Sequence, residues 1–447
     1  MTTQPQSQPP ADAAAPRPTQ DWRLWTFAIL FVALLLRLAV VSFVTTRHPH
    51  MWFYSHPWEM GLLANSLVHG LGYSSPFGVP TGPTAFIAPG YPTIVAAIFL
   101  LFGAYTFTSA LVIMGLNVLV AVATIWLMMR LARDLFDTPT AFAAGLFWAV
   151  SLPVLWLPVI FWESNFSALF FVVMLALALS TRRIPTRANW ILLGVFVAVA
   201  ALINPALLPS FVAIMGWVVF EGWRAACATT PASALTTSWK SPALGALALL
   251  LVFVAWPIRN AVRFHAFIPL RSTVGFELWM GNRPGATGRL DESIYPMFNQ
   301  HELALYRAQG EATYTQNKSA EAWSYVRSHP AAFADMTLRR IYRFWSGTGN
   351  IDASPTYEIH AVTTTVLGII GLALLYRRSR SLAALFALPL LLFPFPYYIT
   401  HAEFRYRLNI DPLLTLLAAF AVTQIVAALA ARRSRPVTAP QLAHPAA

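Results

Sequence analysis

Two glutamates are candidate catalytic residues in a chain that has few carboxylates. Asp and Glu total 18 among 447 residues. Glu59 follows Trp58, and Glu163 follows Phe161 and Trp162, so each carboxylate lies among aromatic side chains. An ionisable group at a membrane boundary is costly to keep there and is a functional candidate by default. Such a carboxylate can serve as a general base that takes a proton from an attacking hydroxyl group.

Arginines next to apolar segments are candidate ligands for a phosphate group. Arg259 and Arg263 follow one apolar run, and Arg405 and Arg407 precede another. The planar guanidinium group matches phosphate oxygens with two parallel hydrogen bonds. Contact with lipid headgroups is the alternative at each position. Arg37 lies inside an apolar run, where it either snorkels to the boundary or faces other helices and pairs with an acid.

Metal and nucleotide chemistry have weaker signals. His56, His401 and Glu403 are scattered and lack the paired spacing of metal ligands, so no cofactor is predicted, with a divalent metal as the alternative. The single cysteine, Cys227, excludes an internal disulfide and a multi-cysteine metal site. The run Gly281–Gly288 contains glycines but does not follow a strand and open a helix, so it is not typical of a nucleotide site.

The composition indicates an integral membrane protein. Hydrophobic residues make up 57% of the chain and charged residues 11%, and the mean hydropathy is +0.58, outside the range of soluble domains. The net charge of +12 suggests nucleic acid, but the basic residues lie in short clusters at the ends of apolar runs. That distribution fits the positive-inside rule better than a nucleic-acid surface.

These basic clusters predict a topology of about ten spans with both termini in the cytoplasm. The predicted spans are 24–44, 107–130, 139–160, 163–180, 190–204, 206–222, 242–257, 358–376, 382–398 and 409–430. The run at 24–44 is too long for a signal-peptide core and is read as a retained helix. Residues 92–103 are too few to cross and predict a juxtamembrane or re-entrant helix.

The same topology divides the chain into five parts. Residues 1–20 form a disordered cytoplasmic tail, and residues 21–257 form a transmembrane core that includes an outer loop at 45–106. Residues 258–352 form an outer, periplasmic subdomain. Residues 353–431 are the last transmembrane helices, and 432–447 are a cytoplasmic tail. All the candidate chemistry then faces one side of the membrane.

Three segments carry a resemblance to a known family. The first loop reads Trp58-Glu59-Met60, then Leu67-x-x-Gly70-x-Gly72-Tyr73, then Pro89-Gly90-Tyr91-Pro92. The second segment runs from Glu277 through Asn282 and Arg283 to Gly288, and the third is Arg405-Tyr406-Arg407. Their order and spacing resemble the GT-C membrane glycosyltransferases, in particular bacterial family 39-like and Rgt-like enzymes that use polyprenyl-phosphate sugars.

The resemblance implies a fold, a reaction and a set of site residues. It implies an all-α GT-C fold and an inverting transfer from a polyprenyl-phosphate sugar to a lipid, glycan or protein acceptor, without nucleic acid, at the outer face of the cytoplasmic membrane. Glu59 would be the base and Glu163 would orient the acceptor or support the base. The substrate-binding positions would be Arg37, His56, Tyr91, Arg259, Arg263, Asn282, Arg283, Arg405 and Arg407.

Two other functions remain open. Relatives carry an aspartate at the base position, often in an acidic pair, whereas this chain has a lone Glu59. A catalytically inactive subunit is therefore one alternative. A transporter or flippase of lipid-linked sugars is the other, and it should show internal repeats and broken polar helices near the membrane midplane. No clear repeat is present in the sequence.

Overall fold

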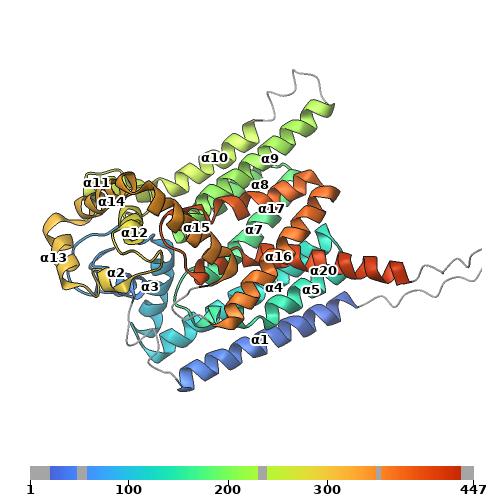
Figure 1. Cartoon of the computed structure of the whole chain (residues 1–447), viewed down its shortest axis with the longest axis horizontal. Helices are drawn as coiled ribbons and strands as arrows, with labels where there is room; N and C mark the ends of the chain where they lie inside the picture. The colour runs from blue at the N-terminus through green and yellow to red at the C-terminus, as the bar shows by residue number, and fades with distance from the viewer. Residues whose placement is uncertain (1–20, 48–57, 230–238, 349–353, 434–447) are drawn as a thin grey trace, which may run out of the picture.

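The computed structural model describes residues 21–47, 58–229, 239–348 and 354–433. Within these ranges the regular elements are helices, apart from one isolated bridge between Ser74 and Pro83. Figure 1 shows two parts: a bundle of long helices and a group of short helices at one end of it. We call the second part the cap. It consists of residues 58–106 and 265–346. The all-α prediction is confirmed.

Eight described helical segments are long and apolar enough to cross a membrane. They are α1 (Trp22–Arg47), α4 (Phe107–Leu135), α7 (Ser164–Arg183), α9 (Leu208–Thr229), α10 with α11 (Lys240–Phe253 and Ala255–Phe264), α16 (Pro355–Arg378), α17 with α18 (Arg380–Leu392 and Phe395–Ile399) and α20 (Asp411–Arg433). The chain is therefore a multi-pass membrane protein.

The prediction of about ten spans is close to the observed number but not equal to it. A ninth crossing is counted if α5 (Thr138–Val150) and the segment after it, bent by 64°, form one span. The predicted span at 190–204 corresponds to α8 (Arg187–Ile203), a shorter apolar helix, and 92–103 corresponds to α3 (Gly90–Phe102). Helix α11 extends beyond the predicted end at residue 257, so Arg259 and Arg263 are helical.

The bend after α5 has a sequence cause and a partner from α1. Ser151 separates α5 from α6 (Leu152–Leu155), and Pro153 cannot supply the N–H that would continue the helix. Arg37 of α1 is fully buried, and its guanidinium donates to the carbonyls of Trp148 at 3.1 Å and Ala149 at 3.2 Å.

The position of Arg37 corrects both sequence interpretations of this residue. It neither snorkels nor pairs with an acid. It instead satisfies orphan carbonyls at a helix end, where the dipole favours a cation. Unpaired carbonyls are costly in the membrane interior, so this contact stabilises the broken helix. A substrate-binding role for Arg37 is not compatible with these contacts.

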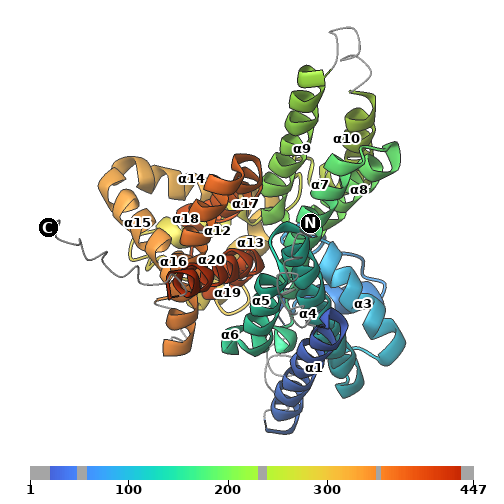
Figure 2. The same ribbon diagram turned by 90° about the vertical axis from the view of Figure 1, so that its right-hand side faces the viewer.

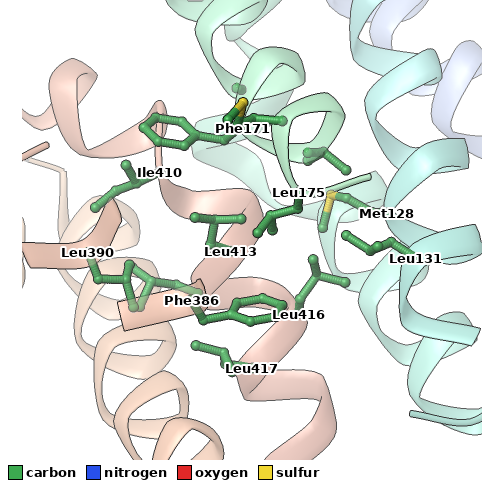
Figure 3. Packing of buried hydrophobic residues seen from close by; sticks show 14 of the residues in the cluster. Met128, Leu131, Phe171, Leu175, Phe386, Leu390, Ile410, Leu413, Leu416 and Leu417 are labelled. Carbon is green, nitrogen blue, oxygen red and sulfur yellow. The ribbon is translucent and has the colours of Figure 1, made fainter. Parts of the chain in front are cut away.

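Two hydrophobic clusters hold the molecule together. The bundle cluster, shown in Figure 3, joins α4, α7, α17 and α20 through residues such as Met128, Phe171, Phe386 and Leu413. The cap cluster joins α2 (Glu59–Val68) and α3 to α12 (Val274–Asn282), α13 (Gln300–Gln309) and α14 (Glu311–Ser328). Residues 58–106 and 265–346 thus share one core, although they are far apart in the sequence.

Glycines bring pairs of bundle helices into close contact. A Cβ at Gly194 of α8 would lie 1.9 Å from the carbonyl oxygen of Gly245 in α10, and one at Gly371 of α16 would lie 2.0 Å from that of Leu417 in α20. Small residues at such crossings are typical of packing in membranes. Figure 2 shows α8, α9 and α10 together on one side of the bundle and α1 on the opposite side.

A buried carboxylate fixes the loop between α2 and α3. Glu311 of α14 accepts hydrogen bonds from the Thr84 hydroxyl at 2.5 Å and the Ala85 N–H at 2.6 Å. The hydroxyls of Ser272 and Tyr306 also donate to it, at 2.7 and 2.6 Å. A carboxylate with four donors is well satisfied despite its burial. These bonds lock the loop onto α14 and so hold one wall of the candidate site.

Candidate active site

Glu59 and Glu163 meet where the cap joins the bundle. Glu59 is the first residue of α2 and is 1% exposed, while Glu163 immediately precedes α7 and is 8% exposed. Their neighbours Trp58 and Trp162 contact each other edge to face, with ring centroids 6.3 Å apart. Burial raises the pKa of Glu163, and the negative charge of Glu59 adds a smaller shift in the same direction, so the two carboxylates are electrostatically coupled.

Burial shifts both carboxylates toward the neutral form. Burial raises the pKa of Glu59 above its ordinary value, although a hydrogen bond from Tyr295 and the charge of Arg271 oppose the shift. Burial also raises the pKa of Glu163, against the charges of Arg405 and Arg271. Within the described residues, Oε2 of each glutamate is buried without a hydrogen-bond partner. Such atoms are uncommon in folded proteins and point to a functional site.

Arg271 supplies a positive charge to both glutamates, and the sequence analysis missed it. Its Nη2 lies 3.7 Å from Oε1 of Glu277, and its Nε donates to the Phe86 carbonyl at 3.3 Å. Burial lowers the pKa of Arg271, but the charges of Glu277 and Glu163 outweigh this effect and raise it. The available signal was an isolated arginine just before the Glu277 motif.

Arg405 and His401 complete the cluster from the segment before α20. The guanidinium of Arg405, in α19 (Phe404–Leu408), lies 4.5 Å from the centre of the Trp162 ring. His401 is 3% exposed; its Nδ1 lies 3.1 Å from Oε2 of Glu277, and its Nε2 lies 2.8 Å from the Tyr406 hydroxyl. His401 was considered in the sequence only as a metal ligand, whereas here it links an acid to a phenol.

Glu277 differs from Glu59 and Glu163 in the direction of its pKa shift. Burial alone would raise its pKa, but the charges of His401 and Arg271, with a hydrogen bond from His401, lower the pKa of Glu277 below its ordinary value. The site therefore contains one carboxylate whose pKa is lowered together with two whose pKa is raised by burial. Carboxylates whose environments differ in this way are typical of sites that divide acid and base roles.

Tyr91 is the fourth predicted residue that lies in this cluster, with Glu59, Glu163 and Arg405. Its ring is 1% exposed in α3. Burial raises the pKa of the Tyr91 hydroxyl above its ordinary value, and the nearby charge of Glu163 raises it further. The first loop thus contributes Glu59 and Tyr91 from two helices that pack against each other.

Arg259 lies elsewhere and has other partners. It donates to the carbonyls of Thr84 at 2.6 Å and Tyr73 at 3.0 Å, and its guanidinium covers the Trp256 ring at 4.8 Å. These contacts fix the loop that Glu311 also holds, and the phosphate-binding role expected for Arg259 stays a prediction. Arg263 is exposed on α11, and its role in donor binding stays a prediction.

Arg407 is fully buried between helices. It pairs with Asp411, and its Nη2 donates to the Ala361 carbonyl at 3.1 Å. The predicted substrate contact at this position is therefore corrected to a structural ion pair. Arg405 and Arg407 are two residues apart on one short helix, but only Arg405 reaches the carboxylate cluster.

Asn282 and Arg283 also have partners within the protein. The Asn282 amide donates to the carbonyls of Leu278 at 2.7 Å and Ile399 at 2.8 Å, which ties α12 to α18. Arg283 pairs with Asp291 in the following loop. Neither contact reaches Glu59 or Glu163. The predicted residue His56 lies outside the described residues.

Metal-binding side chains do not cluster in the described ranges. No group of three or more His, Cys, Asp or Glu side chains there is close enough to share an ion. At the candidate site, Glu277 and His401 are two potential ligands in contact, one fewer than such a group needs.

Comparison with known proteins gives a match in structure only. No family model and no curated protein sequence matches the chain. The archaeal oligosaccharyltransferase AglB from Archaeoglobus fulgidus, solved with an inhibitory peptide and a dolichol-phosphate, superposes with a TM-score of 0.53 at 14% identity, covering 93% of this chain and 52% of that one. The same enzyme tethered to an acceptor peptide containing the NVT sequon gives 0.50 at 15% identity, over 92% and 51%.

The match establishes the fold of the described helices. The chain spans about half the length of these oligosaccharyltransferases. ArnT from Cupriavidus metallidurans, solved with undecaprenyl phosphate, has a TM-score of 0.39 at 14% identity over 94% of this chain and 82% of that one. The chain shares the fold of the archaeal oligosaccharyltransferase, in agreement with the all-α GT-C fold that the sequence resemblance implied.

Proposed function

We propose that this chain is an inverting glycosyltransferase that moves a sugar from a polyprenyl-phosphate donor to a hydroxyl group of a lipid, glycan or protein acceptor. One observation carries the proposal: Glu59 and Glu163, from different segments, converge as buried carboxylates with unpartnered oxygens beside Arg271 and Arg405. Acids for proton transfer and cations for a leaving phosphate are the two components that this reaction needs.

Glu59 is the general base in this proposal. Inversion at an anomeric carbon requires a base on the face opposite the leaving group, where it deprotonates the attacking hydroxyl. Tyr295 donates a hydrogen bond to the Glu59 carboxylate, and Oε2 remains available to accept the acceptor's proton. Burial raises the pKa of Glu59 and so makes its ionised form a stronger base. Glu163 and Tyr91 orient the acceptor.

Arg271 and Arg405 bind the donor phosphate. A phosphate leaving group needs its developing charge stabilised more than it needs a proton. The Arg271 side chain is 26% exposed, and Arg405 is half-buried, so each can reach a ligand while interacting with the carboxylates. His401 contacts Glu277 and the Tyr406 hydroxyl through its two ring nitrogens, so it positions Glu277 and does not bind the phosphate. The proposed phosphate site thus keeps Arg405 from the four arginines expected from the sequence and adds Arg271.

Three observations support the proposed donor and the side of the membrane on which the site lies. The AglB structure is a complex with a dolichol-phosphate, a lipid-linked phosphate. Figure 1 shows the start of α1 and the end of α20 on the side away from the cap. Arg432 and Arg433 end α20, and basic helix ends stay in the cytoplasm. The cap, and with it the site, then faces the outside of the cytoplasmic membrane, where nucleotide sugars are absent.

Mass spectrometry of cell-envelope glycolipids and glycoproteins tests the proposal. A deletion strain should lose one class of glycosylated species, wild-type protein should restore it, and Glu59→Gln protein at equal abundance should not. Nuclear magnetic resonance of the product should show the anomeric configuration inverted relative to the donor. Full restoration by both Glu59→Gln and Glu163→Gln would contradict an enzyme and favour a flippase or an inactive subunit.

A further inference from the structure

Four arginines gather where α15 (Pro330–Ser346) passes the loop after α12. They are Arg289 in the loop and Arg339, Arg340 and Arg343 in the helix. Nη1 of Arg343 donates to the carbonyl of Thr287, two residues before Arg289, at 2.6 Å. Burial lowers the pKa of Arg343, and the charges of Arg289 and Arg339 lower it further. Gly288, at φ +74°, permits the approach, since a Cβ there would lie 3.3 Å from Arg343 Nη1. The glycine run at 281–288 therefore builds this cluster rather than the carboxylate site.

The arginines outnumber the acids that face them. Asp335 pairs with Arg339 at 2.8 Å, and the charge of Glu403 acts on Arg343. Glu403 also accepts from the Leu290 N–H at 3.0 Å.

Within the described residues, the other two arginines, Arg289 and Arg340, form no ion pair. Arg340 is fully buried and donates to Asn282 Oδ1 at 3.2 Å and to the Tyr398 carbonyl at 3.3 Å. Nε of Arg289 is buried without a partner in the described structure. Four cations against two carboxylates leave an excess of positive charge in a partly buried setting, which an anion would stabilise.

On α15, a row of exposed apolar side chains runs beside the row formed by Arg339 and Arg343. Leu338 is 66% exposed and Tyr342 is 65% exposed, one turn apart on α15, and they alternate with Arg339 and Arg343. Helices that lie in a membrane interface carry apolar and basic residues in this way.

The C-terminal end of α15 is attached to a membrane-crossing helix. The Thr365 hydroxyl of α16 donates to the Trp345 carbonyl at 2.9 Å, and the Trp345 indole donates to the Tyr398 hydroxyl at 2.6 Å. Because α16 is one of the segments apolar enough to cross the membrane, this end of α15 is anchored to the transmembrane bundle. The exposed residues of α15 therefore lie beside that bundle.

We propose that Arg289, Arg339 and Arg343 form a binding site for the phosphate of an anionic membrane phospholipid, whose acyl chains run along Leu338 and Tyr342. The guanidinium fork suits a phosphodiester, and the apolar row suits a lipid rather than free phosphate. The site is distinct from the proposed donor site, because the cations that act on Glu59 and Glu163 are Arg271 and Arg405.

A bound phospholipid would stabilise the segment that carries His401 and Arg405. The Ala402 N–H donates to the Gly288 carbonyl at 3.2 Å, and Leu290 donates to Glu403. The loop that carries Arg289 and the segment 401–405 are thus hydrogen-bonded to each other. Lipid occupancy at the arginines would be transmitted to Arg405 through these bonds.

Lipid retention by the purified full-length protein tests this site. Native mass spectrometry would follow binding of phosphatidylglycerol and phosphatidylcholine added at equal concentration. Wild-type protein should retain phosphatidylglycerol preferentially, and the Arg289→Gln/Arg343→Gln double variant should lose roughly tenfold or more of that affinity, as expected for charge-assisted contacts. The matched control is Arg307→Gln/Arg327→Gln, which removes two exposed arginines from α13 and α14 and should retain the lipid normally.

Two outcomes would overturn the proposal. One is equal retention of phosphatidylglycerol by the wild type, the double variant and the control, with all three folded by thermal melting. The other is displacement of phosphatidylglycerol by undecaprenyl phosphate at much lower concentration, in wild type but not in Arg289→Gln/Arg343→Gln. That result would identify the arginines as a donor site.

Discussion

The carboxylate cluster at the cap and the buried ion pair inside the bundle use similar residues in different ways. In the bundle, Asp411 of α20 pairs with Arg407 through one oxygen, and its other oxygen lies 2.5 Å from Nε2 of His360 in α16. Nδ1 of His360 lies 2.7 Å from the hydroxyl of Ser151 at the bend after α5. The chain of contacts joins α5, α16, α19 and α20, and both oxygens of Asp411 are used.

At the cap, by contrast, the glutamates are buried but incompletely paired. Glu59 and Glu163 each keep one oxygen without a partner among the described residues, and burial raises the pKa of both. A fully satisfied buried pair specifies structure, and removing one member is costly. An unsatisfied carboxylate destabilises the fold and persists where a ligand or reaction uses it. The number of satisfied oxygens, rather than burial, separates the two clusters.

The largest expected effect is on turnover, from Glu59→Gln. The amide keeps the shape of the side chain but cannot accept a proton, so turnover should fall roughly 10²–10⁴-fold, the contribution of a positioned base. Thermal stability should not fall, because the change removes a buried acid with an unpaired oxygen. Sugar transfer and thermal melting, measured on the same preparation, check both parts.

Glu163→Gln and Glu292→Gln are the controls for that variant. Glu163→Gln should lose less activity than Glu59→Gln, and Glu292→Gln, at an exposed position, should lose none. A dead Glu163→Gln protein beside an active Glu59→Gln protein would mean that the roles of the two carboxylates are reversed.

The second prediction concerns stability and the bundle network. Asp411→Ala leaves the buried cation of Arg407 without its acid, so the free energy of unfolding should fall by about 3–5 kcal/mol. Denaturant titration in lipid nanodiscs measures this. The matched control is Asp134→Ala, which removes an exposed acid at the end of α4 and should change stability by less than about 0.5 kcal/mol. Equal effects of the two variants would show that satisfaction of Asp411 contributes nothing.

The third prediction separates the two arginines of α19. Arg405→Gln should raise the KM for the polyprenyl-phosphate donor roughly tenfold or more, the loss expected for one charge-assisted contact. The fold should be retained, since Arg405 is half-buried and lies on the Trp162 ring. Arg407→Gln should instead lower the melting temperature. Kinetics at saturating acceptor and thermal melting, run on both variants, would expose a reversed assignment.

The smallest effect is on pH dependence. Burial raises the pKa of Glu59 above 4.5. Its neutral form therefore contributes stability that is complete below pH 4.5 and is lost as the pH rises through the folded-state pKa. Activity requires the ionised base and should rise over the same window. Melting temperature and kcat/KM would be measured from pH 4.5 upward, with Glu59→Gln as the reference. The stability of the wild type relative to the variant should fall with pH while its activity rises. A wild type whose stability rises in parallel with that of the variant would contradict this expectation.

The sequence by itself determined the class of protein and named three of the residues that meet at the candidate site. Apolar length and clustered arginines are properties of local segments, so the multi-pass helical architecture followed from them. The bend at Ser151 and Pro153 was in principle readable from the chain. Glu59, Glu163 and Tyr91 were identified because each lies in a short motif or beside aromatic residues, and the structure brings all three together.

Only the tertiary structure decided which arginines face the carboxylates. Arg37, Arg259 and Arg407 satisfy carbonyls or an acid within the fold, whereas Arg405 and the unpredicted Arg271 reach Glu163. The sequence does not distinguish an arginine that has a structural partner from one that faces the carboxylates. The role of a guanidinium group depends on which acceptors distant segments place within about 3 Å of its donors, and short-range patterns contain no information about those segments.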